Sequence, residues 1–125
     1  MFDERTEKLS HDVIGAAIEV HRVLGPGYLE MVYEQALALE LAGRGVPFAR
    51  QAIIDVEYKG QRIGEGRLDF LVGGVLIVEL KATEALAPVH QAQVISYLKA
   101  TGCRLGLLIN FNVPILKEGI KRIAL

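Results

Sequence analysis

The chain has 125 residues, a formal net charge of −1 at pH 7 and 51% hydrophobic residues. This length predicts one domain over residues 1–125, because a chain of this size can bury roughly two-thirds of its unfolded surface. The near-neutral charge argues against a tight, non-specific nucleic-acid binder, whose affinity comes from many cationic contacts to phosphates. We expect no signal peptide and no membrane span, since the first residues are charged and no apolar run is long enough. The single cysteine, Cys103, excludes an internal disulfide and favours a cytoplasmic location.

Two helices are predicted before the sheet begins. Apolar residues recur at helical spacing from Leu9 to Leu24, and Thr6 is the earlier candidate for the N-cap. The Gly-Pro-Gly run at 25–27 ends this helix, and a second one follows over residues 29–42. Because the connection is short, the two helices are expected to pack as an antiparallel or steeply crossed pair.

Extended structure is predicted from residue 52 onward. Residues 52–58 are rich in β-branched side chains that partly alternate, which favours a strand. Gly64 and Gly66 predict a bulge or bend after the following turn. Two apolar strands are then expected over residues 67–72 and 75–81, joined at a glycine turn.

The last third of the chain predicts a crossover. Pro88 suits the first turn of a helix that runs to about Thr101, and residues 104–110 form an apolar run typical of a buried strand. The strand–helix–strand unit is expected to be a parallel crossover. Residues 115–125 fit either a strand or a helix. The predicted order is therefore α-α-β-β-β-α-β-(β or α), an α/β fold with a mixed sheet flanked by helices.

Three ionisable residues interrupt the apolar hairpin at 67–81, namely Asp69, Glu79 and Lys81. Burying such groups is costly unless each has a partner, a metal ion or exposure at a strand end. Glu79 and Lys81 are two residues apart, so on a strand they point to the same face. The pattern indicates either a structural ion pair or a functional site.

The length of the hairpin turn decides whether Asp69 belongs to such a site. A strict two-residue turn at Gly73 and Gly74 would place Asp69 on the opposite face of the sheet from Glu79. A three-residue loop over 73–75, or a bulge, would instead place Asp69 beside Glu79. A shared site therefore requires the longer connection.

Three motifs in one order carry a resemblance to a known superfamily. Asp69 followed by Glu79-Leu80-Lys81 is similar to the D…(D/E)-x-K signature of the PD-(D/E)XK nucleases, whose acids lie on a hairpin of a mixed sheet. Glu34 has the spacing of the helix-borne glutamate of archaeal Holliday-junction resolvases. Gln93 and Tyr97 resemble the Q-x-x-x-Y motif of RecB-like members.

A narrower resemblance lies between the two predicted helices. Residues 27–33 read Gly-Tyr-Leu-Glu-Met-Val-Tyr, which resembles the signature of the GxxExxY protein family. The likeness extends from about Leu9 to Ile123. It implies a restriction-endonuclease-like fold within the PD-(D/E)XK superfamily.

The resemblance implies a Mg²⁺-dependent, or Mn²⁺-dependent, endo- or exonuclease that hydrolyses DNA phosphodiester bonds. Asp69 and Glu79 would be metal ligands, and the carbonyl of Leu80 would supply another oxygen. Lys81 would orient the attacking water and stabilise the developing charge. Glu34 would complete the metal shell, directly or through water.

Further candidates follow from the same resemblance. Gln93 would bind a metal-bound water or a phosphate oxygen, and Tyr97, one turn further on, would support Gln93 or contact a base or sugar. His90 is a candidate phosphate contact. Glu30 is the alternative to the other helix glutamate as a ligand, or it caps amides near residue 27. Tyr33 is a secondary site candidate or a packing residue with a partner for its hydroxyl.

A second function class stays open. The same fold with an inactive site would act as a module for dimerisation or partner binding. The small size of the chain leaves little room for a specificity domain, so a homodimer or a protein partner is also expected to be compatible with the nuclease hypothesis.

Overall fold

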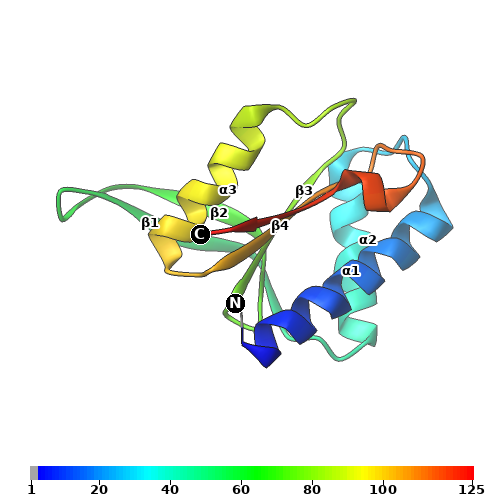
Figure 1. Cartoon of the computed structure of the whole chain (residues 1–125), viewed down its shortest axis with the longest axis horizontal. Coiled ribbons are helices and arrows are strands. Elements are labelled where there is room, and N and C mark those ends of the chain that lie inside the picture. The colour runs from blue at the N-terminus through cyan, green and yellow to red at the C-terminus, as the bar shows by residue number, and fades with distance from the viewer. Residues whose placement is uncertain (1–2) are drawn as a thin grey trace.

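The computed structural model describes residues 3–125, which form a mixed β-sheet with helices on both faces. Helices α1 (Glu4–Leu24) and α2 (Glu30–Gly43) cover one face, and α3 (Pro88–Thr101) covers the other (Figure 1). The predicted α/β class is confirmed. None of the helices in this range is both long and apolar enough to cross a membrane.

Five strands make up the sheet of the described residues, in the spatial order β1-β2-β3-β4-β5. The strands are β1 (Phe48–Tyr58), β2 (Gln61–Val72), β3 (Leu76–Lys81), β4 (Leu105–Asn110) and β5 (Ile120–Ala124). Strands β3 and β4, which α3 connects, pair directly in parallel, and the other neighbouring strands pair antiparallel. The predicted parallel pairing is confirmed. The ambiguous tail forms a 3₁₀ turn (Leu116–Gly119) followed by a strand.

The first helix begins earlier than the prediction placed it. Asp3 is the N-cap, and its carboxylate accepts a hydrogen bond of 2.7 Å from the Thr6 backbone N–H. The prediction of Thr6 as the cap is therefore wrong. The carboxylate of an aspartate accepts a hydrogen bond from a free backbone amide, and its negative charge is also stabilised by the positive end of the helix dipole, so it is the stronger cap.

The β1–β2 hairpin begins earlier than predicted, but it carries a bulge where the sequence predicts one. Strand β1 already begins at Phe48, and β2 runs without interruption through Gly64 and Gly66. The register shifts between the pairs Val56–Gly64 and Glu57–Arg62, so β2 carries one extra residue, Ile63, next to Gly64, where the sequence predicts a bulge. Gly66 allows β2 and α3 to approach each other closely, because a Cβ there would lie 2.9 Å from Cε1 of Tyr97 on α3. The far end of this hairpin projects past α3 (Figure 1).

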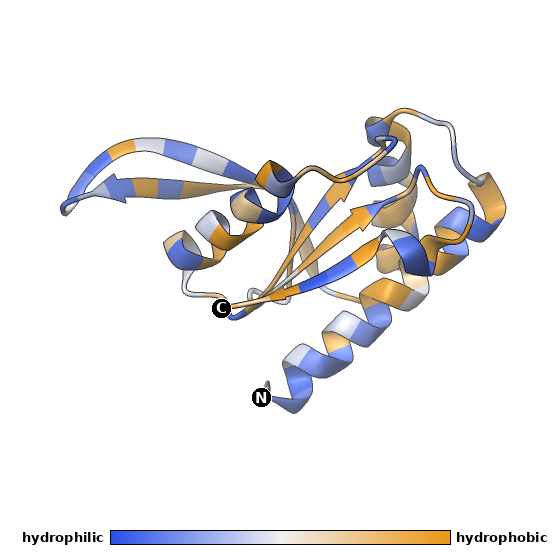
Figure 2. Ribbon diagram, turned by 45° about the horizontal axis from the view of Figure 1, so that its top comes forward, coloured by the Kyte–Doolittle hydropathy of each residue, from blue (hydrophilic) through white to orange (hydrophobic). Residues whose placement is uncertain are grey.

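The sheet separates two clusters of buried apolar side chains. The larger cluster lies under α1 and α2, and the smaller one lies under α3. Figure 2 shows the inner strands as mostly apolar, whereas the projecting hairpin alternates between polar and apolar residues. Residues two apart on a regular strand share a face, yet Leu68 joins the α3 cluster and Phe70 joins the other. Strand β2 therefore changes face at Asp69.

Candidate active site

The loop that connects β2 to β3 has three residues, the longer of the two connections that the sequence allows. Val72 pairs with Leu76, and the ladder continues through Leu71 with Ile77 to Phe70 with Val78. Residues 73–75 form the loop. Continuing the same register by one residue places Asp69 opposite Glu79, as a shared site requires.

Asp69 and Glu79 lie where the two strands separate. The backbone N–H of Asp69 donates to Oε2 of Glu79 at 2.6 Å, and the backbone N–H of Leu80 donates to Oδ2 of Asp69 at 2.8 Å. The ladder pairs end at Phe70 and Val78, so side-chain carboxylates take the place of strand-to-strand bonds. Each acid is thereby held by an amide of the opposite strand.

Burial makes both carboxylates unfavourable as anions. It raises the pKa of Glu79 to about 8, with the nearby charge of Asp69 as the next cause. Burial is also the largest cause of the raised pKa of Asp69, and the Leu80 amide partly opposes it. Lys81, which is half-buried, acts in the opposite direction on both pKa values. A cation placed at the pair would favour both charged forms.

The donor chemistry of this pair suits a magnesium ion. Mg²⁺ is bound by one or two carboxylates and keeps several waters, so it does not need a cage made only of protein. Within residues 3–125, no group of three or more Asp, Glu, His or Cys side chains is arranged to hold a metal ion. The two carboxylates, with the Leu80 carbonyl, are therefore the oxygen atoms of the hairpin that could bind such an ion.

Glu34 points from α2 toward this pair but is occupied by other partners. The side chain of Glu34 is buried. Its Oε2 accepts a hydrogen bond of 2.7 Å from Nη2 of Arg50, and its Oε1 accepts one of 2.7 Å from Nε2 of Gln51. The same Gln51 nitrogen lies 3.5 Å from Oδ1 of Asp69. The structure thus connects Glu34 to Asp69 through an amide.

Glu30 is exposed on the first turn of α2 and lies within electrostatic range of the same acids. Loss of hydration is the largest cause of its raised pKa, which Lys81 lowers and Asp69 and Glu34 raise. Glu30 is therefore the more accessible of the two helix glutamates.

Helix α3 approaches the pair from the other face of the sheet. Burial raises the pKa of the Tyr97 hydroxyl, and the charges of Glu79 and Asp69 raise it further. Hydrogen bonds with the Arg67 backbone and the Gln93 side chain act against that shift. Gln93, which is exposed, and Tyr97 therefore lie together beside the acidic pair.

His90 caps the start of α3. Its Nδ1 accepts a hydrogen bond of 3.0 Å from the backbone N–H of Ala87. That contact leaves the other ring nitrogen as the one with which a phosphate would interact.

Tyr33 holds the turn between α1 and α2. It is fully buried, its hydroxyl donates to the Gly25 carbonyl at 2.6 Å, and it accepts from the Tyr28 N–H at 3.2 Å. Its ring stacks on Phe111, with 4.5 Å between centroids. These contacts orient the start of α2, and hence Glu30.

Arg50 and Gln51 were not predicted from the sequence. They precede residues 52–58, over which the sequence predicts a strand. Their proximity to Glu34 depends on β1 beginning at Phe48 and on the packing of α2 beside it. No short motif carries that information.

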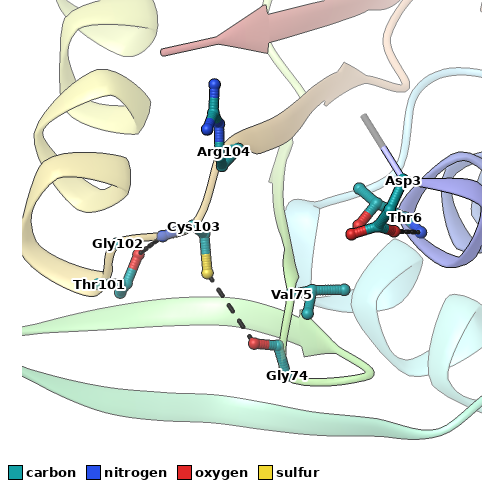
Figure 3. Close-up of a pocket in the computed structure, with 8 residues that line it drawn as sticks. All are labelled: Asp3, Thr6, Gly74, Val75, Thr101, Gly102, Cys103 and Arg104. Carbon is teal, nitrogen blue, oxygen red and sulfur yellow. Dashed lines mark hydrogen bonds between the residues drawn. The ribbon is translucent and has the colours of Figure 1, made fainter. Parts of the chain in front are cut away.

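A separate cavity of about 410 Å³ lies at the other end of the hairpin. Gly74 and Val75 of the β2–β3 loop line it, together with Cys103, Arg104 and the start of α1 (Figure 3). The Asp3 carboxylate at its rim is already used as the cap of α1. Neither Asp69 nor Glu79 contributes to this cavity.

Comparison with known proteins agrees with this geometry. A search of curated proteins gives no significant match to the chain. A family model, described as the PD-(D/E)XK nuclease superfamily, matches residues 7–123 and so includes the hairpin and all three helices that approach it. The chain belongs to the PD-(D/E)XK nuclease superfamily.

Proposed function

We propose that this protein is a Mg²⁺-dependent, or Mn²⁺-dependent, nuclease that hydrolyses phosphodiester bonds of DNA. The observation that carries the proposal is the pair formed by Asp69 and Glu79, each held by an amide of the opposite strand and each disfavoured as an anion by burial. Lys81 follows on the same strand face as Glu79. We also infer that the chain is a GxxExxY protein, supported by the motif at 27–33 and by the contacts of its tyrosine.

The residues of the hairpin have distinct roles in this proposal. Asp69 and Glu79 would hold the divalent ion, which when bound supplies an activated water and neutralises phosphate charge. Lys81 would hydrogen-bond that water and a phosphate oxygen, and its positive charge would favour the charge that develops there. The Leu80 amide keeps Asp69 aimed at the gap between the strands.

We assign different tasks to the two helix glutamates. Glu34 already accepts two hydrogen bonds of 2.7 Å, so its task is to support the Asp69 side of the site. Glu30 is exposed and electrostatically coupled to Lys81 and Asp69, so it is the glutamate proposed to contact a metal-bound water. Of the two candidates, we therefore propose Glu30, the glutamate of the GxxExxY motif, for the contact with the metal-bound water.

Helix α3 would contribute substrate contacts. Gln93 and Tyr97 are proposed to contact a phosphate oxygen and a base or sugar, and they reach the site on the face opposite to α2. His90, one turn earlier, would meet the adjacent phosphate. A tyrosine beside a nucleotide can also stack, which is tolerant of base identity.

The test is cleavage of linear, nicked and branched DNA with Mg²⁺ or Mn²⁺. We expect the wild type to cleave, and Asp69→Asn and Lys81→Ala each to lose at least about a hundredfold in rate, since each removes a group that acts in the transition state. Asp55→Asn is the matched control, because Asp55 is an exposed strand acid that pairs with Arg62 on the projecting hairpin. It is expected to keep wild-type activity.

Two other outcomes would contradict the proposal. Equal cleavage by Asp69→Asn would place the activity elsewhere or in a contaminant. No cleavage, with no heat of Mg²⁺ or Mn²⁺ binding in calorimetry, would favour the inactive module that acts in dimerisation or partner binding.

A further inference from the structure

Gln51 has an unusual backbone conformation for a residue inside a strand. Its φ is +49°, and among residues 3–125 the other non-glycine residue with positive φ is Lys59, with φ +51°. Such a conformation costs free energy, which the surrounding contacts must offset. Lys59 lies in the tight β1–β2 turn, where the chain must reverse. Gln51 has no such reason, because β1 continues on both sides of it.

The conformation coincides with an interruption of the ladder. Arg50 pairs with Phe70 and Ala52 pairs with Leu68, but the intervening pair of Gln51 with Asp69 is missing. This is the position at which β2 changes face. Both strands are therefore irregular at the same level, directly beside the acidic pair.

The side chain of Gln51 makes use of this irregularity. Its Nε2 donates to Oε1 of Glu34 at 2.7 Å and lies 3.5 Å from Oδ1 of Asp69. A carboxamide between two carboxylates satisfies both as a donor without adding a charge. Arg50 holds the other oxygen of Glu34 at 2.7 Å, so the acceptor to which Gln51 is bound is itself fixed.

Asp69 is consequently held from two sides. The Leu80 amide binds Oδ2 from β3, and the Gln51 amide approaches Oδ1 from β1. We propose that Gln51 is a positioning residue whose carboxamide, anchored on Glu34, fixes the Asp69 carboxylate in the gap between β2 and β3. Its effect on cleavage rests on the proposed nuclease function, whereas its effect on Asp69 does not.

The substitution Gln51→Gly separates this role from a purely structural one. Glycine adopts a positive φ without cost, so the variant removes the carboxamide and relieves the backbone at the same time. Lys59→Gly is the matched control, because it relieves the same conformation far along the hairpin. Both variants are expected to unfold in urea at the wild-type midpoint or above it.

The decisive measurement is amide hydrogen exchange of Leu80 in the metal-free protein. In Gln51→Gly we expect this amide to exchange at least tenfold faster, with Ile109 in β4 unchanged as the reference for global opening. Lys59→Gly is expected to leave both amides unchanged. Unaltered Leu80 exchange in Gln51→Gly would overturn the proposal.

Cleavage then tests the functional consequence. We expect Gln51→Gly to lower kcat at least tenfold with little change in KM for DNA, while Lys59→Gly keeps both. Full activity of Gln51→Gly would overturn the role in cleavage. If the wild type does not cleave, faster Leu80 exchange still supports the positioning role, and only the nuclease function fails.

Discussion

At the scale of single residues, the acidic pair depends on where backbone pairing stops. Asp69 and Glu79 bind backbone amides that a continuous ladder would have used for strand pairing. Each carboxylate is fixed in direction, but neither recovers the hydration that it loses on burial. Burial therefore disfavours the charged form of each carboxyl group, and a cation bound at the pair would favour it.

This charge makes the metal-free protein sensitive to pH. The pKa of Glu79 is about 8 in the folded chain, against an ordinary value of 4.5. Between these values the folded state binds a proton that the unfolded state has lost, so the free energy of unfolding is expected to fall as pH rises from about 5 to about 8. Urea unfolding in EDTA measures this slope. Glu79→Gln should flatten it, and Glu57→Gln, an exposed acid on β1, should not. An identical slope in Glu79→Gln would contradict this cause.

At the scale of elements, the β1–β2 hairpin and α3 must approach each other closely to bring Tyr97 to the acids. Gly66 permits this approach, because its missing Cβ leaves space for the tyrosine ring. The neighbouring Gly64 faces open space, with nothing within 4 Å of a Cβ built there. Two glycines that look equivalent in the sequence thus have different roles.

The two glycines give a matched pair of variants. Gly66→Ala would place a methyl group 2.9 Å from Cε1 of Tyr97. Overpacking of this kind typically costs about 1–3 kcal/mol, and we expect it to displace Tyr97 and to weaken DNA binding. Gly64→Ala should change neither property. Urea unfolding and a DNA-binding titration measure the difference, and equal behaviour of the two variants would argue against this contact.

At the scale of the whole molecule, the mixed sheet gathers groups from distant parts of the chain. The antiparallel hairpin supplies the acids, the crossover through α3 supplies Gln93 and Tyr97, and α2 supplies Glu30 and Glu34. A metal ion that bound only this folded arrangement would add its binding free energy to the stability of the whole protein.

Metal addition is therefore expected to stabilise the folded protein. At a Mg²⁺ or Mn²⁺ concentration about 100 times the Kd, the gain is about 2.7 kcal/mol, seen as a higher unfolding midpoint. The double variant Asp69→Asn with Glu79→Gln should lose this gain, although it is expected to be at least as stable as the wild type without metal. An equal metal-induced shift in that variant would show that the ion binds elsewhere.

The sequence by itself determined the class of the fold and the identity of the acidic pair. Helix α3 begins at Pro88 and ends before the left-handed Gly102, and the apolar strands β3 and β4 lie where unbroken apolar runs predicted them. These features follow from local chemistry, because proline, glycine and apolar runs act within a few residues. The motif of Asp69, Glu79 and Lys81 was visible for the same reason.

Only the tertiary structure decided how those residues meet. Both turn lengths at residues 73–75 were compatible with the sequence, and pairing across the hairpin selects the longer one. The partners of Glu34, the positive φ of Gln51 and the close approach at Gly66 each depend on contacts between segments far apart in the chain. Such contacts form only when α2, the sheet and α3 pack together, so no local pattern in the sequence encodes them.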